Sequence, residues 1–194
     1  MDYIFSDIQN HFNFSYMVSS GYIAILTMAI FFLVLILLMP GRKLHDRILV
    51  ALFFGFMFIV YSLTILMRGY RESGRRIMTQ PFYWLIVLRR TGRTQLLWLA
   101  IENVVMLMIP AFILGIIMRS VKIPVRIVII TLIMVFFSLT IECMQLALNV
   151  GECEIDDFLC NTFGGLLGAA LASLVTAKIA GANNNVVDDS KGDF

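Results

Sequence analysis

Hydrophobic residues stand in long, nearly uninterrupted blocks along this 194-residue chain. An amphipathic helix of a soluble protein would instead place them at every third or fourth position. A block of about 18 or more nearly uncharged residues can cross the roughly 30 Å hydrocarbon core of a bilayer as a helix, which pairs its backbone groups internally. Five such blocks predict transmembrane helices, over residues 21–39, 48–67, 95–118, 127–148 and 158–177.

The predicted fold is therefore all-α, a bundle of about five transmembrane helices that forms a single domain over residues 1–178. Composition agrees, because 60% of the residues are hydrophobic and 14% are charged, against about 45–50% and about 25% in soluble proteins. The first ten residues contain two aspartates and no Lys or Arg, so we expect no cleavable signal peptide. Residues 179–194 are polar, small and acidic, which predicts a disordered tail.

The connection over residues 68–94 is strongly basic, with seven arginines and one glutamate. It also contains eight apolar residues, 81–88, which are too few to cross a bilayer. Phe82, Tyr83 and Trp84 within them are aromatic residues, a type that settles at the level of the lipid headgroups. We predict a short re-entrant or interfacial segment here, with arginines that hold phospholipid headgroups or a specific anion.

The distribution of Lys and Arg gives the expected orientation. The side with the first and third loops and the C-terminus holds eight of them and the other side holds seven, so the total does not decide. The short basic turns at 40–47 and 119–126 favour their side as the cytoplasmic one. We therefore expect the N-terminus and the acidic loop, residues 151–157, to lie outside, and the C-terminus inside.

Polar side chains occur at a similar depth in three of the predicted spans. Glu102 and Asn103 lie seven and eight residues into the third span, about 10–12 Å from its arginine-rich end. Glu142 and Gln145 lie near the end of the fourth span, and Asn161 near the start of the fifth. Since an ionisable group within a span costs about 2.5–3.5 kcal/mol on insertion scales, such groups are functional candidates. A structural ion pair or hydrogen bond between helices is the alternative.

Helical spacing places these groups on common faces. Glu142, Gln145 and Asn149 stand at i, i+3 and i+7, which is one face of a helix. A second face combines polar residues with glycines that allow close helix packing, namely Asp157, Asn161, Gly164 and Gly168.

Four acids within residues 152–157 could hold a hard divalent cation. The loop has no EF-hand pattern, however, and His11 and His45 are distant in sequence. We predict no metal site and no cofactor, since GxSxG, HExxH, P-loop and Rossmann motifs are also missing from the sequence. A disulfide between Cys153 and Cys160 would require their loop to face an oxidising compartment.

Residues 139–168, LTIECMQLALNVGECEIDDFLCNTFGGLLG, resemble the signature of the VanZ family. That signature is a Glu-x-x-Gln near the end of one helix, a Gly and two spaced acids in the loop, then Asn and glycines that open the next helix. Its residues fall on Glu142, Gln145, Glu154, Asp157, Asn161, Gly164, Gly165 and Gly168. At the position of Glu154 the family more often has Asp.

Upstream, Arg75 followed by Pro81 and Phe82 is similar to the family's Arg…Pro-Phe loop. Asn103 with Pro110 is similar to its Asn…Pro helix, with one extra residue between them. The resemblance covers residues 75–175, and the first predicted span precedes it. From the resemblance and the depth of the polar groups together, we expect the ligand-binding residues to be Arg75, Phe82, Trp84, Glu102, Asn103, Glu142, Gln145, Glu154, Asp157 and Asn161.

The resemblance implies a multi-pass protein of the bacterial plasma membrane, with the acidic loop outside. It also implies lowered susceptibility to teicoplanin and related lipoglycopeptides, without implying a chemical step. We expect the protein to bind or remodel an envelope amphiphile, such as a membrane lipid, a lipid-linked cell-wall precursor or the acyl tail of the drug, and not nucleic acid. An enzyme that uses Glu142 as acid or base on a lipid headgroup, and a small transporter or ion pathway, are the alternatives.

Overall fold

A computed structural model describes residues 26, 29–30, 33–34, 41, 43–68 and 76–189, with side chains through Ala180. Its elements in order are α3 (Leu44–Tyr61), the π-helical turn η1 (Ser62–Leu66), β1 (Ile77–Met78), α4 (Tyr83–Thr91), α5 (Gln95–Ile117), α6 (Ile123–Leu148), β2 (Cys153–Glu154) and α7 (Ile155–Asp189). The first predicted span, residues 21–39, lies outside the described residues apart from a few helical positions.

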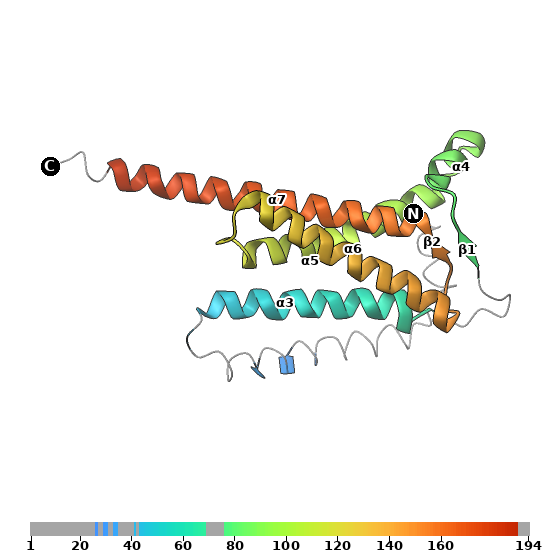
Figure 1. The fold of residues 1–194 in the computed structure, drawn as a ribbon, viewed down its shortest axis with the longest axis horizontal. Coiled ribbons are helices and arrows are strands. Elements are labelled where there is room, and N and C mark those ends of the chain that lie inside the picture. The colour runs from blue at the N-terminus through green and yellow to red at the C-terminus, as the bar shows by residue number, and fades with distance from the viewer. Residues whose placement is uncertain are drawn as a thin grey trace.

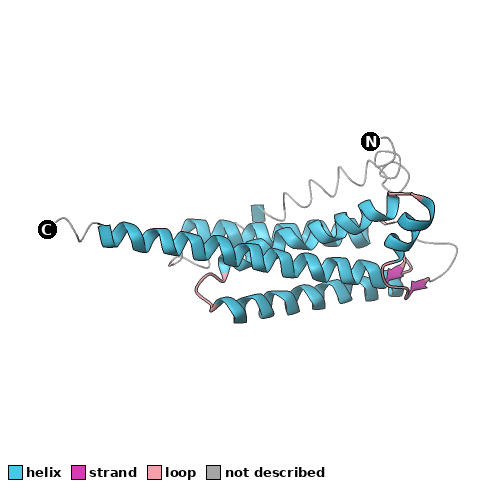
Figure 2. Ribbon diagram, turned by 90° about the horizontal axis from the view of Figure 1, so that it is seen from above, coloured by secondary structure: helices cyan, strands magenta, loops and turns pink. Residues whose placement is uncertain are grey.

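Four helical segments in the described part of the chain are long and apolar enough to cross a membrane, namely Leu44–Leu66, Gln95–Ile117, Ile123–Leu148 and Ile155–Ala180. They run alongside one another as a bundle (Figure 1). The all-α membrane bundle predicted from the sequence is thus confirmed. The two short strands and the short helix α4 gather at one end of this bundle (Figure 2), which we call the α4 end.

Glycines on α7 set its closest contacts. A Cβ added at Gly164 would collide with the carbonyl oxygen of Val104, and one at Gly168 with the carbonyl oxygen of Met108, both on α5. Gly165 faces α6 instead, where a Cβ would meet the Met134 side chain. Small residues let helix backbones approach closely within a membrane. Accordingly, α7 makes its most extensive contacts with α5 and the next most extensive with α6.

Two helices begin earlier than the apolar blocks predict. α6 starts at Ile123 instead of 127, because Pro124 fits the first turn, where no backbone N–H is needed. α7 starts at Ile155 instead of 158, which brings Asp156 and Asp157 into its first turn. Negative charge is favourable at that position, since the helix dipole is positive there. α7 also continues to Asp189, through residues that the composition assigns to a tail.

The early start of α6 places a charged residue inside the bundle. Arg126 is only 1% exposed. Its guanidinium donates hydrogen bonds to Ser173 Oγ at 3.2 Å, Thr176 Oγ1 at 2.9 Å and the Gly115 carbonyl at 3.5 Å. Arg126 therefore links α5, α6 and α7 at the end opposite to α4, although the sequence places it in the short basic turn at 119–126.

Candidate functional site

A short parallel ladder joins the arginine-rich connection to the acidic loop. Ile77 of β1 pairs with Cys153 of β2, and Met78 pairs with Glu154 (Figure 1). The Cys153 N–H donates to the carbonyl of Arg76 at 3.1 Å. Adjacent parallel strands need a long crossover between them, and here α4, α5 and α6 supply it. The ladder holds the loop between α6 and α7 against the arginine-rich connection.

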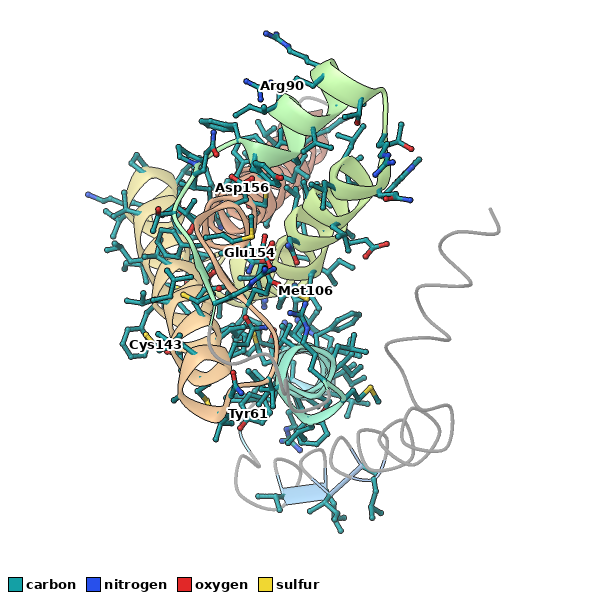
Figure 3. The ribbon with its side chains drawn as sticks, turned by 90° about the vertical axis from the view of Figure 1, so that its right-hand side faces the viewer. Tyr61, Arg90, Met106, Cys143, Glu154 and Asp156 are labelled. Atoms are coloured by element: carbon teal, nitrogen blue, oxygen red, sulfur yellow. The ribbon has the colours of Figure 1, made fainter. Side chains whose placement is uncertain are left out.

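Asp156 holds α4 against the start of α7. Its two carboxylate oxygens accept hydrogen bonds from the backbone N–H groups of Phe82 at 2.5 Å, Tyr83 at 2.7 Å and Trp84 at 3.4 Å. These amides stand at the N-terminus of α4, where a helix has no internal acceptors and favours negative charge. Phe82 adopts a left-handed φ of 57°, as the residue that precedes the helix. In Figure 3, Asp156 lies on the side of α7 that is nearest to α4.

Three carboxylates from different elements meet at the α4 end, and we call Glu142, Glu154 and Asp157 the acid cluster. Glu142 of α6 is 4% exposed, and its Oε2 accepts a hydrogen bond from the backbone N–H of Glu154 at 2.9 Å. Asp157 of α7 accepts one from Asn103 Nδ2 of α5 at 2.6 Å. The three carboxylates are close enough to interact electrostatically. Glu154 lies near the middle of this end of the bundle (Figure 3).

Arg68, just after the second span, supplies a positive charge to the site. It interacts electrostatically with all three carboxylates of the acid cluster. Its guanidinium packs against Gly151, where an added Cβ would stand 2.7 Å from Nη1. Gly151 also has a φ of 105°, so glycine fits both the backbone and the contact. Arg75, the arginine expected from the resemblance, lies outside the described residues.

Burial and charge alter the acidity of the loop. Burial, together with the nearby carboxylates of Asp157, Glu152 and Asp156, raises the pKa of Glu154 to about 7, while Arg68 opposes them. Burial also raises the pKa of the Cys153 thiol. Glu154 therefore exchanges its proton near neutral pH. Cys143, Cys153 and Cys160 are free thiols.

Two amides lie one turn further along the helices that carry the acids. Gln145 is 1% exposed, and its Nε2 donates to the Thr64 carbonyl in η1 at 3.1 Å. Asn161 of α7 is also 1% exposed. Within the described part of the chain, Gln145 Oε1 and Asn161 Oδ1 are buried without a hydrogen-bond partner. Asn149, on the same face as Glu142, is buried and ends α6 with a left-handed φ of 56°.

The structure does not gather every expected residue. Glu102 is exposed on α5, although its neighbour Asn103 reaches Asp157. Phe82 and Trp84 bring their backbone amides to Asp156, and Phe82 is 56% exposed. The sequence patterns did not identify Arg68, Asp156 and Thr64 as residues of the site. The available signal for Arg68 was its position, since it is the first charge after a span.

Comparison with known proteins now identifies the family. Residues 23–176 match the family model described as VanZ/LLP1. The chain belongs to the VanZ/LLP1 family. The match starts within the first predicted span and so extends beyond residues 75–175. A search of curated proteins and a search of solved structures each found no match. In this VanZ/LLP1 protein, Glu142, Glu154 and Asp157 of the family signature come together at the α4 end of the bundle, while its glycines pack α7 against α5 and α6.

Proposed function

We propose that this multi-pass membrane protein lowers susceptibility to teicoplanin and related lipoglycopeptides by binding or remodelling an amphiphilic ligand of the bacterial envelope. The ligand binds at the acid cluster, on the outer side of the plasma membrane. The observation that carries the proposal is the convergence of Glu142, Glu154 and Asp157 with Arg68 at one end of an apolar bundle. Lipid hydrocarbon cannot form hydrogen bonds with such groups, so they must contact one another, water or a ligand.

The surroundings of the acid cluster suit a ligand with a polar head and an apolar tail. Asp157 is two residues from the start of α7, and Glu142 is six residues from the end of α6. The helices around them expose large apolar side chains along their length, such as Trp98 and Val105 on α5 and Phe163 on α7. An amphiphile can therefore place its head at the acid cluster while its tail remains in the bilayer.

A second candidate is an intramembrane enzyme that acts on a lipid headgroup with Glu142 as acid or base. The observation in its favour is a second carboxyl group beside Glu142. The backbone N–H of Glu154 donates a hydrogen bond to Glu142, and the Glu154 carboxyl has a pKa of about 7. A group that titrates near the working pH is suited to proton transfer. Mass spectrometry of lipids from cells with and without the protein would reveal a changed headgroup, which a binding protein would not produce.

Substitution of the acids tests the proposed function. In a susceptible bacterial host, Glu142→Gln and Asp157→Asn should return teicoplanin susceptibility to that of cells without the protein, because each replaces a carboxyl group of the acid cluster with an amide of nearly the same shape. Membrane accumulation is measured by immunoblot in parallel. Asp46→Asn is the matched control, since Asp46 pairs with Arg119 at the opposite end. Full protection by both acidic variants at equal accumulation would refute the site.

A further inference from the structure

Among the described residues, the acid cluster has more negative charge than its neighbours neutralise. Three carboxylates share the guanidinium of Arg68. Other described charges nearby already have partners. Arg76 forms an ion pair with Glu152 at 3.6 Å, and Asp156 accepts hydrogen bonds from the backbone N–H groups at the start of α4. With all three carboxylates ionised, the acid cluster and Arg68 together carry a charge of −2. Burying such an excess is unfavourable unless protons or a cation compensate it.

Hydrogen-bond acceptors are also in excess at the same place. Glu142 and Asp157 accept hydrogen bonds from one backbone N–H and one amide N–H. The buried oxygens Gln145 Oε1 and Asn161 Oδ1 have no donor within the described residues. Buried polar atoms are almost always paired, so an unpaired acceptor indicates a missing donor.

Both unpaired oxygens lie next to the acid cluster along the helix faces. Asn161 is four residues after Asp157, on the α7 face whose Gly164 and Gly168 contact α5. Asn103 of α5 reaches Asp157 across that same contact. Gln145 is three residues after Glu142 on α6. Each unpaired oxygen therefore belongs to a residue one helical turn from an acid of the acid cluster, and Gln145 lies beside η1, where its Nε2 donates to the Thr64 carbonyl.

We propose that the acid cluster binds the protonated amine of a cationic amphiphile. This inference rests on the proposed function and names the ligand class for it. An ammonium group has one positive charge, three N–H donors and no acceptor, which complements an excess of negative charge and acceptors. A phosphate or carboxylate head would add charge and acceptors of the kind already in excess, and Arg68 is already surrounded by carboxylates.

The spacing of the acids favours an organic cation over a metal ion. Calcium and magnesium require several oxygens at about 2.0–2.6 Å from one centre. No group of three acidic, histidine or cysteine side chains in the described part of the chain converges closely enough to hold a metal ion. An ammonium group on a flexible chain has less demanding geometry, since its hydrogen bonds span about 2.7–3.2 Å and tolerate bent approaches.

Binding of an amine should weaken as the pH falls. Glu154 has a pKa of about 7, so lowering the pH from 8 to 6 protonates it and removes its negative charge from the acid cluster, while an alkylamine stays protonated throughout. The charged groups that surround Glu154 come from the end of the second span, α6, the loop and α7, namely Arg68, Glu142, Glu152, Asp156 and Asp157.

Thermal unfolding of the purified full-length protein in detergent tests the inference with three twelve-carbon probes: dodecylamine, N-dodecylacetamide and dodecanoate. At pH 8, dodecylamine should raise Tm saturably, by about 5–10 °C at one hundred times its Kd. The uncharged amide and the anion should give no saturable shift. The dodecylamine shift should shrink at pH 6. In Asp157→Asn and Glu154→Gln, the Kd for dodecylamine should increase about tenfold, the effect of losing about 1.4 kcal/mol.

Asp46→Asn is again the control and should bind dodecylamine like the parent. If Asp157→Asn does not fold, Glu154→Gln decides, because its side chain belongs to the loop. An equal or larger saturable shift with dodecanoate would overturn the inference about charge and leave the proposed amphiphile binding intact. If no probe shifts Tm while Glu142→Gln still abolishes teicoplanin protection, the inference fails and the proposed function stands. If the acidic variants protect fully but dodecylamine binds, the proposed function fails instead.

Discussion

At the scale of single residues, the absence of a side chain at two positions sets the distance between α5 and α7. Gly164 and Gly168 each bring the α7 backbone against a carbonyl oxygen of α5. A backbone oxygen cannot rotate out of the way as the end of a flexible side chain can. These contacts also position Asn103 to reach Asp157, so the glycines contribute to the site without belonging to it.

Gly164→Ala should therefore destabilise the protein, because the new methyl group would overlap the Val104 carbonyl. Overpacking of this kind costs about 1–3 kcal/mol, which for a chain of this size lowers Tm by roughly 2–10 °C. Gly41→Ala is the control, since no atom of the described residues lies within 4 Å of a Cβ at that position. Thermal unfolding in detergent measures both, and equal Tm values for the two variants would contradict the close approach of α5 and α7.

At the scale of elements, α4 is attached to the bundle through its first turn as well as through partial burial. None of its residues is fully buried, but residues 83–88 are partly buried and α4 contacts α5. Asp156 also engages three of its amides, and β1 just before it pairs with β2. Hydrogen bonds to a charged group contribute about 1.5–3 kcal/mol each when well formed. The position of α4 thus depends strongly on one carboxylate.

Asp156→Asn should loosen α4 and leave the long helices intact, because the amide keeps one acceptor oxygen but loses the charge. Hydrogen exchange followed by mass spectrometry should show amides of residues 82–91 exchanging about tenfold faster or more, which corresponds to a loss of about 1.4 kcal/mol. Exchange within α5 and α7 should match the parent. Unchanged protection of residues 82–91 would show that other contacts hold α4.

The elements also show which features the sequence could predict. Long apolar blocks give the spans, and helical spacing places Glu142 with Gln145 and Asp157 with Asn161, because both signals are local. Three other features could not be predicted from local signals: the role of Arg68, the attachment of α4 by Asp156 and the β1–β2 ladder. They join segments about 70 to 90 residues apart, and no local pattern encodes such contacts. Charge and donor counts at the site likewise require the assembled structure.

At the scale of the whole molecule, the two ends of the bundle differ in charge. The end opposite to α4 is basic among the described residues, with Lys43, Arg47, Arg119, Lys122, Arg126 and Lys178 against Asp46, Asp188 and Asp189. The α4 end has arginines too, yet two of them, Arg68 and Arg76, face carboxylates. Basic residues near the ends of spans favour the cytoplasmic side, whereas acids have little effect on orientation. We therefore expect the acid cluster on the outer side, where an envelope ligand would reach it.

Labelling of single cysteines from outside intact cells tests this orientation. In a background with Cys143, Cys153 and Cys160 replaced by serine, a membrane-impermeant maleimide should modify Ile155→Cys, because residue 155 is 37% exposed at the start of α7. It should spare Lys191→Cys until the cells are permeabilised, which also verifies that the second thiol can react. The reverse pattern would place the acid cluster on the cytoplasmic side. A ligand of the outer leaflet would then be excluded, although the contacts within the acid cluster would be unaffected.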